Sequence, residues 1–240
     1  MYKKTLLLAI GFACQISVSF AQNNNNNNTD LRNQQLNAGS SLANSGEWIY
    51  QLNQIETEGS PLLHENWQKG SIKNNSGVLF QNIDLIYNAY KDELIYKNEK
   101  GSAFIANKGT IAEFSFADQR QLFKLVKLKR DNGKELNSFC QVLYEGTKLL
   151  LVQQHTKNFY PAQRQQSAYN SNSNKDTYQD KKILFLVKDG IATEIPKRKK
   201  PILKLLADKE AKLKEFADKN NVDFEKEKDI VMLLAYYETL

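Results

Sequence analysis

Short apolar runs separated by turn-forming residues fill the chain from about residue 46 to residue 195. The runs are rich in β-branched and aromatic residues and lie at 84–87, 94–96, 104–106, 111–116, 122–128, 139–144, 149–152 and 183–187. Clusters of asparagine, aspartate and glycine separate many of them, and these residues favour tight turns because they tolerate positive φ. The pattern predicts eight or more strands joined by hairpins, as in an antiparallel meander.

The strongest hairpin signal joins residues 122–128 to residues 139–144. Asn132-Gly133 lies between the two runs and favours a tight turn. Because side chains alternate between the faces of a strand, the second run divides into two sets: Cys140, Val142 and Tyr144 on one face, and Phe139, Gln141 and Leu143 on the other. Both sets are largely apolar. We therefore expect a central strand, covered on one side by helices or curled against the opposite wall of a partial barrel.

After Pro196 the spacing of the apolar residues changes to that of helices. Stripes within 202–206, 213–217 and 230–237 predict two or three short helices, with Asp208 and Asp223 as candidate N-caps. Each stripe needs an apolar partner, and the open face of the sheet is the nearest one. The predicted fold class is mainly β (α+β), an antiparallel meander or partial barrel followed by two or three short C-terminal helices.

A polar segment at residues 157–181 interrupts the strand pattern. It is rich in glutamine, serine, asparagine and lysine, and it carries Tyr160, Tyr169 and Tyr178. These tyrosines are candidates for a surface that binds glycan or protein. Their even spacing matches no regular face, so we interpret the segment as a hairpin excursion.

Residues 1–21 show the features of an export signal in the usual order. Two lysines precede an apolar run at 6–14, and Ser19-Phe20-Ala21 forms a small-x-small cleavage site. The run is too short to span a bilayer. We expect an exported protein, located in the periplasm, at the outer-membrane periphery or outside the cell. Its mature chain begins at Gln22 and carries no transmembrane segment.

Cys14 leaves a second interpretation open, because a lipoprotein signal also places a cysteine at the end of its apolar run. Ala13 suits lipid attachment, whereas Gly11 stands where an aliphatic residue is expected. Membrane association is predicted only if Cys14 carries a lipid. In either case residues 22–45, with asparagine at every position from 23 to 28, predict a disordered tether because they hold too few apolar residues to fold.

Removal of the signal changes both the charge and the cysteine count. The formal net charge falls from +6 to +4, because Lys3 and Lys4 leave with the signal. This small excess does not imply a nucleic-acid partner. Cys140 remains as the single cysteine and has no second cysteine for an intrachain disulfide. Its apolar surroundings predict a small buried side chain rather than a nucleophile.

The densest run of charge is Lys197-Arg198-Lys199-Lys200. Contact with anionic lipid, lipopolysaccharide or nucleic acid is one interpretation of such a run. Prolines flank it on both sides, and aromatic residues that would stack on bases are absent around it. We therefore interpret it as a solvated connector.

No catalytic or cofactor motif stands out. The sequence contains no G-x-S-x-G elbow, phosphate loop, dinucleotide fingerprint or H-E-x-x-H. Two histidines and one mature cysteine are too few for the usual four ligands of a structural zinc site. The pair His64-Glu65 points to opposite sides of an extended chain, which predicts a solvated loop rather than a dyad. His155 is predicted at the surface, at the end of the strand over 149–152. We assign no catalytic, cofactor-binding or metal residue.

Paired carboxylates are the remaining route to an enzyme. Glycoside hydrolysis needs two carboxyl groups about 5 to 10 Å apart. Five candidates are Asp84, Asp92, Glu93, Glu113 and Glu145. A hydrolase requires at least two of them to converge in a cleft, whereas a binding protein predicts an apolar or aromatic-lined groove without a buried carboxylate pair.

From about residue 46 to its end, the chain resembles the secreted, functionally uncharacterised β-rich proteins of Bacteroidota. The segments that carry the resemblance are Gly59-Ser60-Pro61 leading to Trp67-Gln68-Lys69-Gly70, residues 86–94, residues 142–150 and Leu233-Leu234-Ala235-Tyr236-Tyr237. The resemblance implies export from a Gram-negative cell and a meander followed by helices. It implies no activity and no site.

These observations predict four segments and one function. The segments are a signal peptide at 1–21, an Asn-rich tether at 22–45, an antiparallel β domain at 46–195 and a helical segment at 196–240 packed on it. The predicted function is that of an exported, non-enzymatic envelope protein with a binding or accessory role, which needs no cofactor and has an envelope protein or a glycan as its partner. The alternatives are a small secreted hydrolase of glycan or peptide and a lipid-anchored surface protein.

Overall fold

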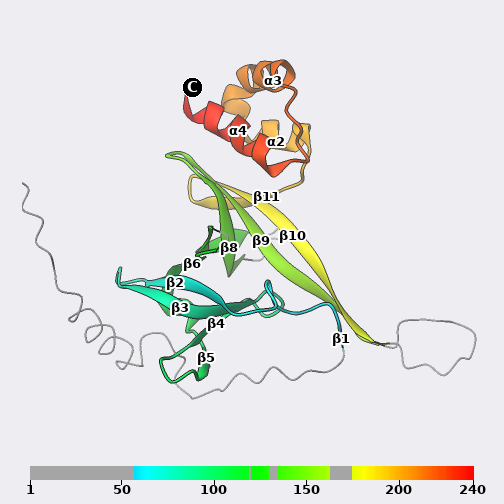
Figure 1. Ribbon diagram of the computed structural model, residues 1–240. Coiled ribbons are helices and arrows are strands. Elements are labelled where there is room, and N and C mark those ends of the chain that lie inside the picture. The colour runs from blue at the N-terminus through cyan, green and yellow to red at the C-terminus, as the bar shows by residue number, and fades with distance from the viewer. Residues whose placement is uncertain (1–56, 119, 130–134, 163–174) are drawn as a thin grey trace, which may run out of the picture. The chain divides into compact units, whose positions relative to one another are not determined.

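The computed structural model describes residues 57–118, 120–129, 135–162 and 175–240 (Figure 1). The predicted signal and tether lie outside the described residues. The strands are β1 (Thr57–Glu58), β2 (Gln68–Asn74), β3 (Leu79–Asn88), β4 (Glu93–Lys97), β5 (Ala103–Ile105), β6 (Ile111–Phe116), β7 (Gln121–Lys129), β8 (Glu135–Glu145), β9 (Leu149–Tyr160), β10 (Asp176–Lys188) and β11 (Ile191–Ile195). The α-helices are α2 (Lys199–Leu205), α3 (Glu210–Lys219) and α4 (Glu227–Glu238).

The strands form one mixed sheet in which most sequence neighbours pair as antiparallel hairpins. The order across the sheet is β1-β10-β9-β8-β7-β6-β2-β3-β4-β5, and β11 pairs with both β10 and β7. Two pairings are parallel, β1 with β10 and β11 with β7. The predicted fold class is confirmed, since a mainly β chain with a partial ring precedes three C-terminal helices.

Five strands make the ring. β7 to β10 pair in succession, β11 turns back along β10, and its far side meets β7. Closure uses two residue pairs, Ala192 with Leu128 and Thr193 with Lys129. The predicted hairpin over 122–128 and 139–144 forms two of these strands, in a register that pairs Leu125 with Phe139. Its predicted turn at Asn132-Gly133 lies outside the described residues.

Side chains from all five strands fill the ring. The buried ones are Leu128, Cys140, Val152, Ile183, Phe185 and Ala192. Cys140 is fully buried and forms no disulfide within the described residues, which confirms its prediction as a small core side chain. A register shift in β8 between Val142 and Tyr144 then changes the alternation. Tyr144 packs with Leu143 against the helices rather than with Val142 in the ring, so the predicted face of Tyr144 is wrong because the shift adds a residue.

The three helices cover one end of the β9–β10 hairpin (Figure 1). Their apolar stripes meet strand residues that face away from the ring. This helix-covered cluster includes Leu149, Leu151, Leu184 and Leu186 from the strands and Ile202, Leu206, Leu213, Ile230, Leu233 and Leu234 from the helices. The sheet therefore buries both faces here, one in the ring and one under the helices, as its two apolar faces require.

A carboxylate at the end of α4 fixes the helices to the β8–β9 turn. Glu238 accepts hydrogen bonds from the backbone N–H groups of Lys148 (2.9 Å) and Leu149 (3.0 Å) through Oε1, and from the Thr147 hydroxyl (2.6 Å) through Oε2. The turn has glycine at Gly146, where a Cβ atom would lie 2.3 Å from Glu238 Oε1. The close approach of this carboxylate therefore depends on the missing side chain.

The two predicted helix caps are wrong. Asp208 lies in a 3-10 turn, and its carboxylate accepts hydrogen bonds from Lys188 Nζ (2.9 Å) and the Tyr237 hydroxyl (2.8 Å). Asp223 accepts a hydrogen bond from the N–H of Glu225, two residues ahead, and α4 begins later, at Glu227. Both carboxylates are occupied by other donors and leave the helix N-termini without a side-chain cap.

Below the helices, a cluster of aromatic rings joins β3, β6, β7 and β8. Phe114 and Phe123 stack with centroids 4.8 Å apart, and Phe139 meets Phe114 edge-on at 5.1 Å. Tyr87 contacts all three of these rings. This aromatic core holds the part of the sheet beyond the ring against the ring itself.

Candidate functional site

Both histidines lie on one side of the aromatic core, each held by a glutamine. Nε2 of His64 donates to Oε1 of Gln121 (3.0 Å), and its ring meets Phe116 edge-on. Nε2 of His155 donates to Oε1 of Gln141 (2.7 Å), and its ring contacts Phe123. Because β9 continues five residues past His155 to Tyr160, the predicted surface position of His155 is wrong: the side chain is 8% exposed.

The environment of His155 is that of a structural group. Burial lowers the pKa of His155 to about 4, and the nearby Lys182 adds to the effect. The imidazole is therefore neutral at physiological pH and is a weak base. Its hydrogen bond to Gln141 satisfies one ring nitrogen inside the protein.

A third titratable group, Glu227, lies at the start of α4. Gln153 Nε2 (2.5 Å) and Lys197 Nζ (2.9 Å) both donate to Oε1 of Glu227. Burial raises the pKa of Glu227, but the two hydrogen bonds outweigh it and the pKa lies below its ordinary value. His64, His155 and Glu227 are thus each held by a glutamine or lysine partner.

The five candidate carboxylates divide between ion pairs and turns. Glu113 of β6 and Glu145 of β8 approach the same lysine, Lys124 of the intervening strand β7. Nζ of Lys124 lies 4.0 Å from Glu113 and 2.6 Å from Glu145, and all three side chains are at least partly exposed. Asp84 pairs with Lys69 (2.8 Å). Glu113 also pairs with Lys73 (3.6 Å), so both carboxylates take part in ion pairs across neighbouring strands.

Asp92 and Glu93, at the β3–β4 turn, are used differently. Asp92 has a positive φ of 58° and accepts hydrogen bonds from the Tyr87 hydroxyl (2.6 Å) and the Phe139 N–H (3.2 Å), while its second oxygen binds Lys108. Burial, and then the Asp92 carboxylate, raise the pKa of Tyr87 well above its ordinary value. In the described part of the chain, Oε2 of Glu93 is buried and has no hydrogen-bond partner. These contacts fasten the turn to β8.

The β3–β4 turn also carries Tyr90, whose ring contacts those of Phe159 and Tyr178. We call these three partly exposed rings the aromatic patch. The centroid distances are 6.0 Å from Tyr90 to Phe159, 5.3 Å from Tyr90 to Tyr178 and 4.9 Å from Phe159 to Tyr178. Tyr90 is 43% exposed and Phe159 36%. Phe159 and Tyr178 are cross-strand partners of β9 and β10, so both rings stand on one face.

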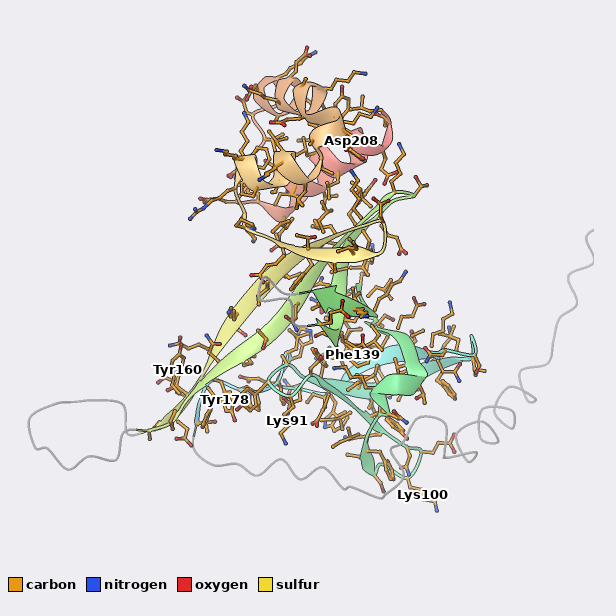
Figure 2. All side chains as sticks on the ribbon, turned by 180° about the vertical axis from the view of Figure 1, so that it is seen from behind. Lys91, Lys100, Phe139, Tyr160, Tyr178 and Asp208 are labelled. Carbon is orange, nitrogen blue, oxygen red and sulfur yellow. The ribbon has the colours of Figure 1, made fainter. Side chains whose placement is uncertain are left out.

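The patch lies toward the end of the β9–β10 hairpin remote from the helices, where Figure 2 labels Tyr178 and Tyr160. Of the three predicted tyrosines, Tyr178 belongs to the patch. Tyr160 follows Phe159 in β9 and points to the opposite face, and Tyr169 lies outside the described residues. Tyr90 and Phe159 were not predicted from the sequence, because their contact joins segments about 70 residues apart. The available signal is the turn Asn88–Asp92, in which Lys91 and Asp92 follow the tyrosine.

The basic run is partly used in ion pairs. Lys197 binds Glu227, and Lys199, the first residue of α2, binds Asp218 of α3. These contacts tie the connector after β11 to the other two helices. They agree with its interpretation as a connector.

Comparison with protein-family models, curated proteins and solved structures gives no match. The description of the site therefore depends on its geometry. Among the described residues, no group of three histidine, cysteine or acidic side chains is placed to hold a metal ion. None of the described helices has the length and apolar character needed to cross a membrane.

Proposed function

We propose that the protein is an exported, non-enzymatic binding protein of the cell envelope and that the aromatic patch contacts its ligand. The observation that carries this proposal is the exposure of Tyr90 and Phe159 in a cluster of three rings built from separate segments. Large aromatic side chains exposed together are typical of binding surfaces. The carboxylates, in contrast, are engaged with lysines or hold a turn.

Retention of envelope material on the purified protein tests this proposal. We expect immobilised wild-type protein to retain a component of the native envelope fraction, and a Y90A/Y178A variant to lose it. An I191A/M232A variant is the matched control, because it removes two exposed apolar side chains that lie outside the patch. Equal retention by the wild type and the patch variant, or none by the wild type, contradicts the proposal.

Export and anchoring are tested on the native protein by mass spectrometry. An N-terminus at Gln22 supports cleavage of an ordinary signal peptide. A diacyl or triacyl group on Cys14 supports the alternative of a lipid-anchored surface protein, for which the position of Cys14 at the end of the apolar run is the motivating observation. A chain that retains Met1 contradicts both.

A further inference from the structure

The size of the aromatic patch limits what it can bind. A whole aromatic side chain offers about 150 to 250 Å², so three rings with roughly a third exposed present about 200 Å². A stable protein partner covers about 800 Å² on each side. The patch by itself therefore covers only about a quarter of one side of such an interface, and its area suits a ligand the size of one or two sugar rings.

The chemistry around the rings is mixed rather than apolar. Two of the three rings carry a phenolic hydroxyl. Asp180, 74% exposed, lies two residues beyond Tyr178 in β10 and pairs with Lys157 of β9 at 2.5 Å. By strand alternation this ion pair is on the same face as Phe159 and Tyr178. Lys91, next to Tyr90, is also exposed. Apolar ring faces bordered by charged hydrogen-bonding groups match a ligand with both C–H surfaces and hydroxyl groups.

The patch is also held in place before any ligand arrives. The Tyr90 N–H donates to the carbonyl of Pro61 (3.1 Å), and the Lys91 N–H donates to Oδ1 of Asn88 (3.0 Å). Gly59 lies close against the backbone of Tyr178. Its φ is +76°, and a Cβ atom at this position would lie 2.4 Å from the Tyr178 carbonyl oxygen. These contacts fix the backbone that carries Tyr90 and Tyr178, and a backbone that is ordered beforehand loses little entropy on binding.

We infer that the aromatic patch binds carbohydrate, with the C–H face of a pyranose ring against Tyr90, Phe159 and Tyr178 and the ring hydroxyls toward Asp180 and Lys91. This inference rests on the proposed function and names the ligand class of the same site. A pyranose has an apolar face and a polar edge, as the patch and its border require. The three rings are inclined to one another by 52°, 72° and 44°, so a sugar ring contacts them at different angles rather than lying flat on all three.

Saturation-transfer-difference NMR with defined sugars tests the inference on the purified protein. The probes are cellohexaose, a β-linked N-acetylglucosamine tetrasaccharide and soluble peptidoglycan fragments. We expect saturation of the ring C–H protons of at least one probe. We also expect at least a tenfold loss of its affinity in the Y90A and Y178A variants. Y178L keeps an apolar side chain but removes the ring, so it shows the same loss if the aromatic face is what binds.

The matched control is Y160A. It removes a tyrosine that is 49% exposed at the neighbouring position of β9 but on the opposite face, so sugar affinity stays within twofold of the wild type. Circular dichroism and thermal melting show whether each variant is folded. If Y178A does not fold, Y178L replaces it in the comparison.

The outcomes separate this inference from the proposed function. If no probe binds at millimolar concentration while the patch still retains a protein from the envelope fraction, the carbohydrate inference is overturned and the proposed function stands. If neither sugar binding nor retention depends on the patch, both are overturned. Sugar binding that is unchanged in Y90A and Y178A also overturns the inference, because the sugar then binds elsewhere.

Discussion

The two ends of the β9–β10 hairpin use the same strands but differ in what covers them. At the end near α4, Leu151 and Leu184 are buried beneath the helices. Toward the other end, on the same face, Phe159 and Tyr178 pack against Tyr90 and remain partly exposed. A strand therefore places apolar groups on a face without determining their role. Where the helices cover the face these groups stabilise the fold, and the exposed groups at the other end are those that we propose to contact a ligand.

The largest effect is expected at the covered end. Leu151→Ala removes a fully buried side chain between the strands and the helices, and we expect the free energy of unfolding to fall by about 2 to 5 kcal/mol. Urea unfolding followed by circular dichroism measures the change. Leu79→Ala is the matched control, since Leu79 is about half exposed, and its change is expected within about 0.5 kcal/mol. Similar losses in both variants would show that the helices do not protect this end.

Between the two ends, His155 is expected to make stability depend on pH. Its pKa is about 4 in the folded protein, below the ordinary 6.5, so the unfolded chain binds more protons between these values. The contribution of the neutral His155 imidazole to the free energy of unfolding is complete above pH 6.5. It is lost as the pH falls toward 4, and the loss is at most about 3 kcal/mol. Urea unfolding from pH 8 to pH 4 measures it. His155→Gln is expected to reduce the dependence of the free energy of unfolding on pH and to leave its value at pH 8 close to that of the wild type. An unchanged pH dependence would contradict this role.

The attachment of α4 to the β8–β9 turn gives a smaller effect at the covered end. Glu238→Ala removes three hydrogen bonds to a carboxylate that is partly exposed, and we expect a loss of about 1 to 2 kcal/mol. Glu238→Gln keeps an acceptor oxygen and is expected to lose less. Hydrogen exchange at the amides of Lys148 and Leu149 reports the contact directly, and protection that persists in Glu238→Ala would argue against it.

The smallest effect on stability is expected in the aromatic patch. Phe159→Ala lies eight positions after Leu151 on the same face of β9. Because its ring is partly exposed, we expect the free energy of unfolding to change by no more than about 1 kcal/mol. Thermal melting and urea unfolding, compared with Leu151→Ala, measure the difference between the two ends. A loss as large as that of Leu151→Ala would mean that the patch is part of the core and not a binding surface.

The repeated turns and apolar runs were enough to predict the helices and eight of the described strands, because they are local signals, but they did not include β1, β2 or β11. The two apolar faces of β8 were also informative, since one face does fill a ring and the other packs against helices and aromatic rings. The contact between β11 and β7 was not predictable in this way. It consists of two residue pairs between distant segments and leaves no pattern in the sequence.

Polar residues were harder to place than apolar ones. Gln153, Gln154 and His155 are buried although their polarity predicts a surface, because each finds a partner across strands or from a helix. The candidate site shows the same limit. Tyr178 was recognisable as a tyrosine in a polar segment, but Tyr90 meets it only because the Asp92 contacts fold the β3–β4 turn toward β8.

The closure of the ring by Ala192 and Thr193 has a consequence for the order of folding. The hairpins from β7 to β11 form between sequence neighbours, whereas closure must bring together residues more than 60 positions apart. Contacts across such long separations form late, since the entropy of the loop must be lost first. We therefore expect the ring to close after its walls exist. Because Cys140 is buried inside the ring, we expect its thiol to react with reagents only when the ring opens, so its reactivity measures that opening.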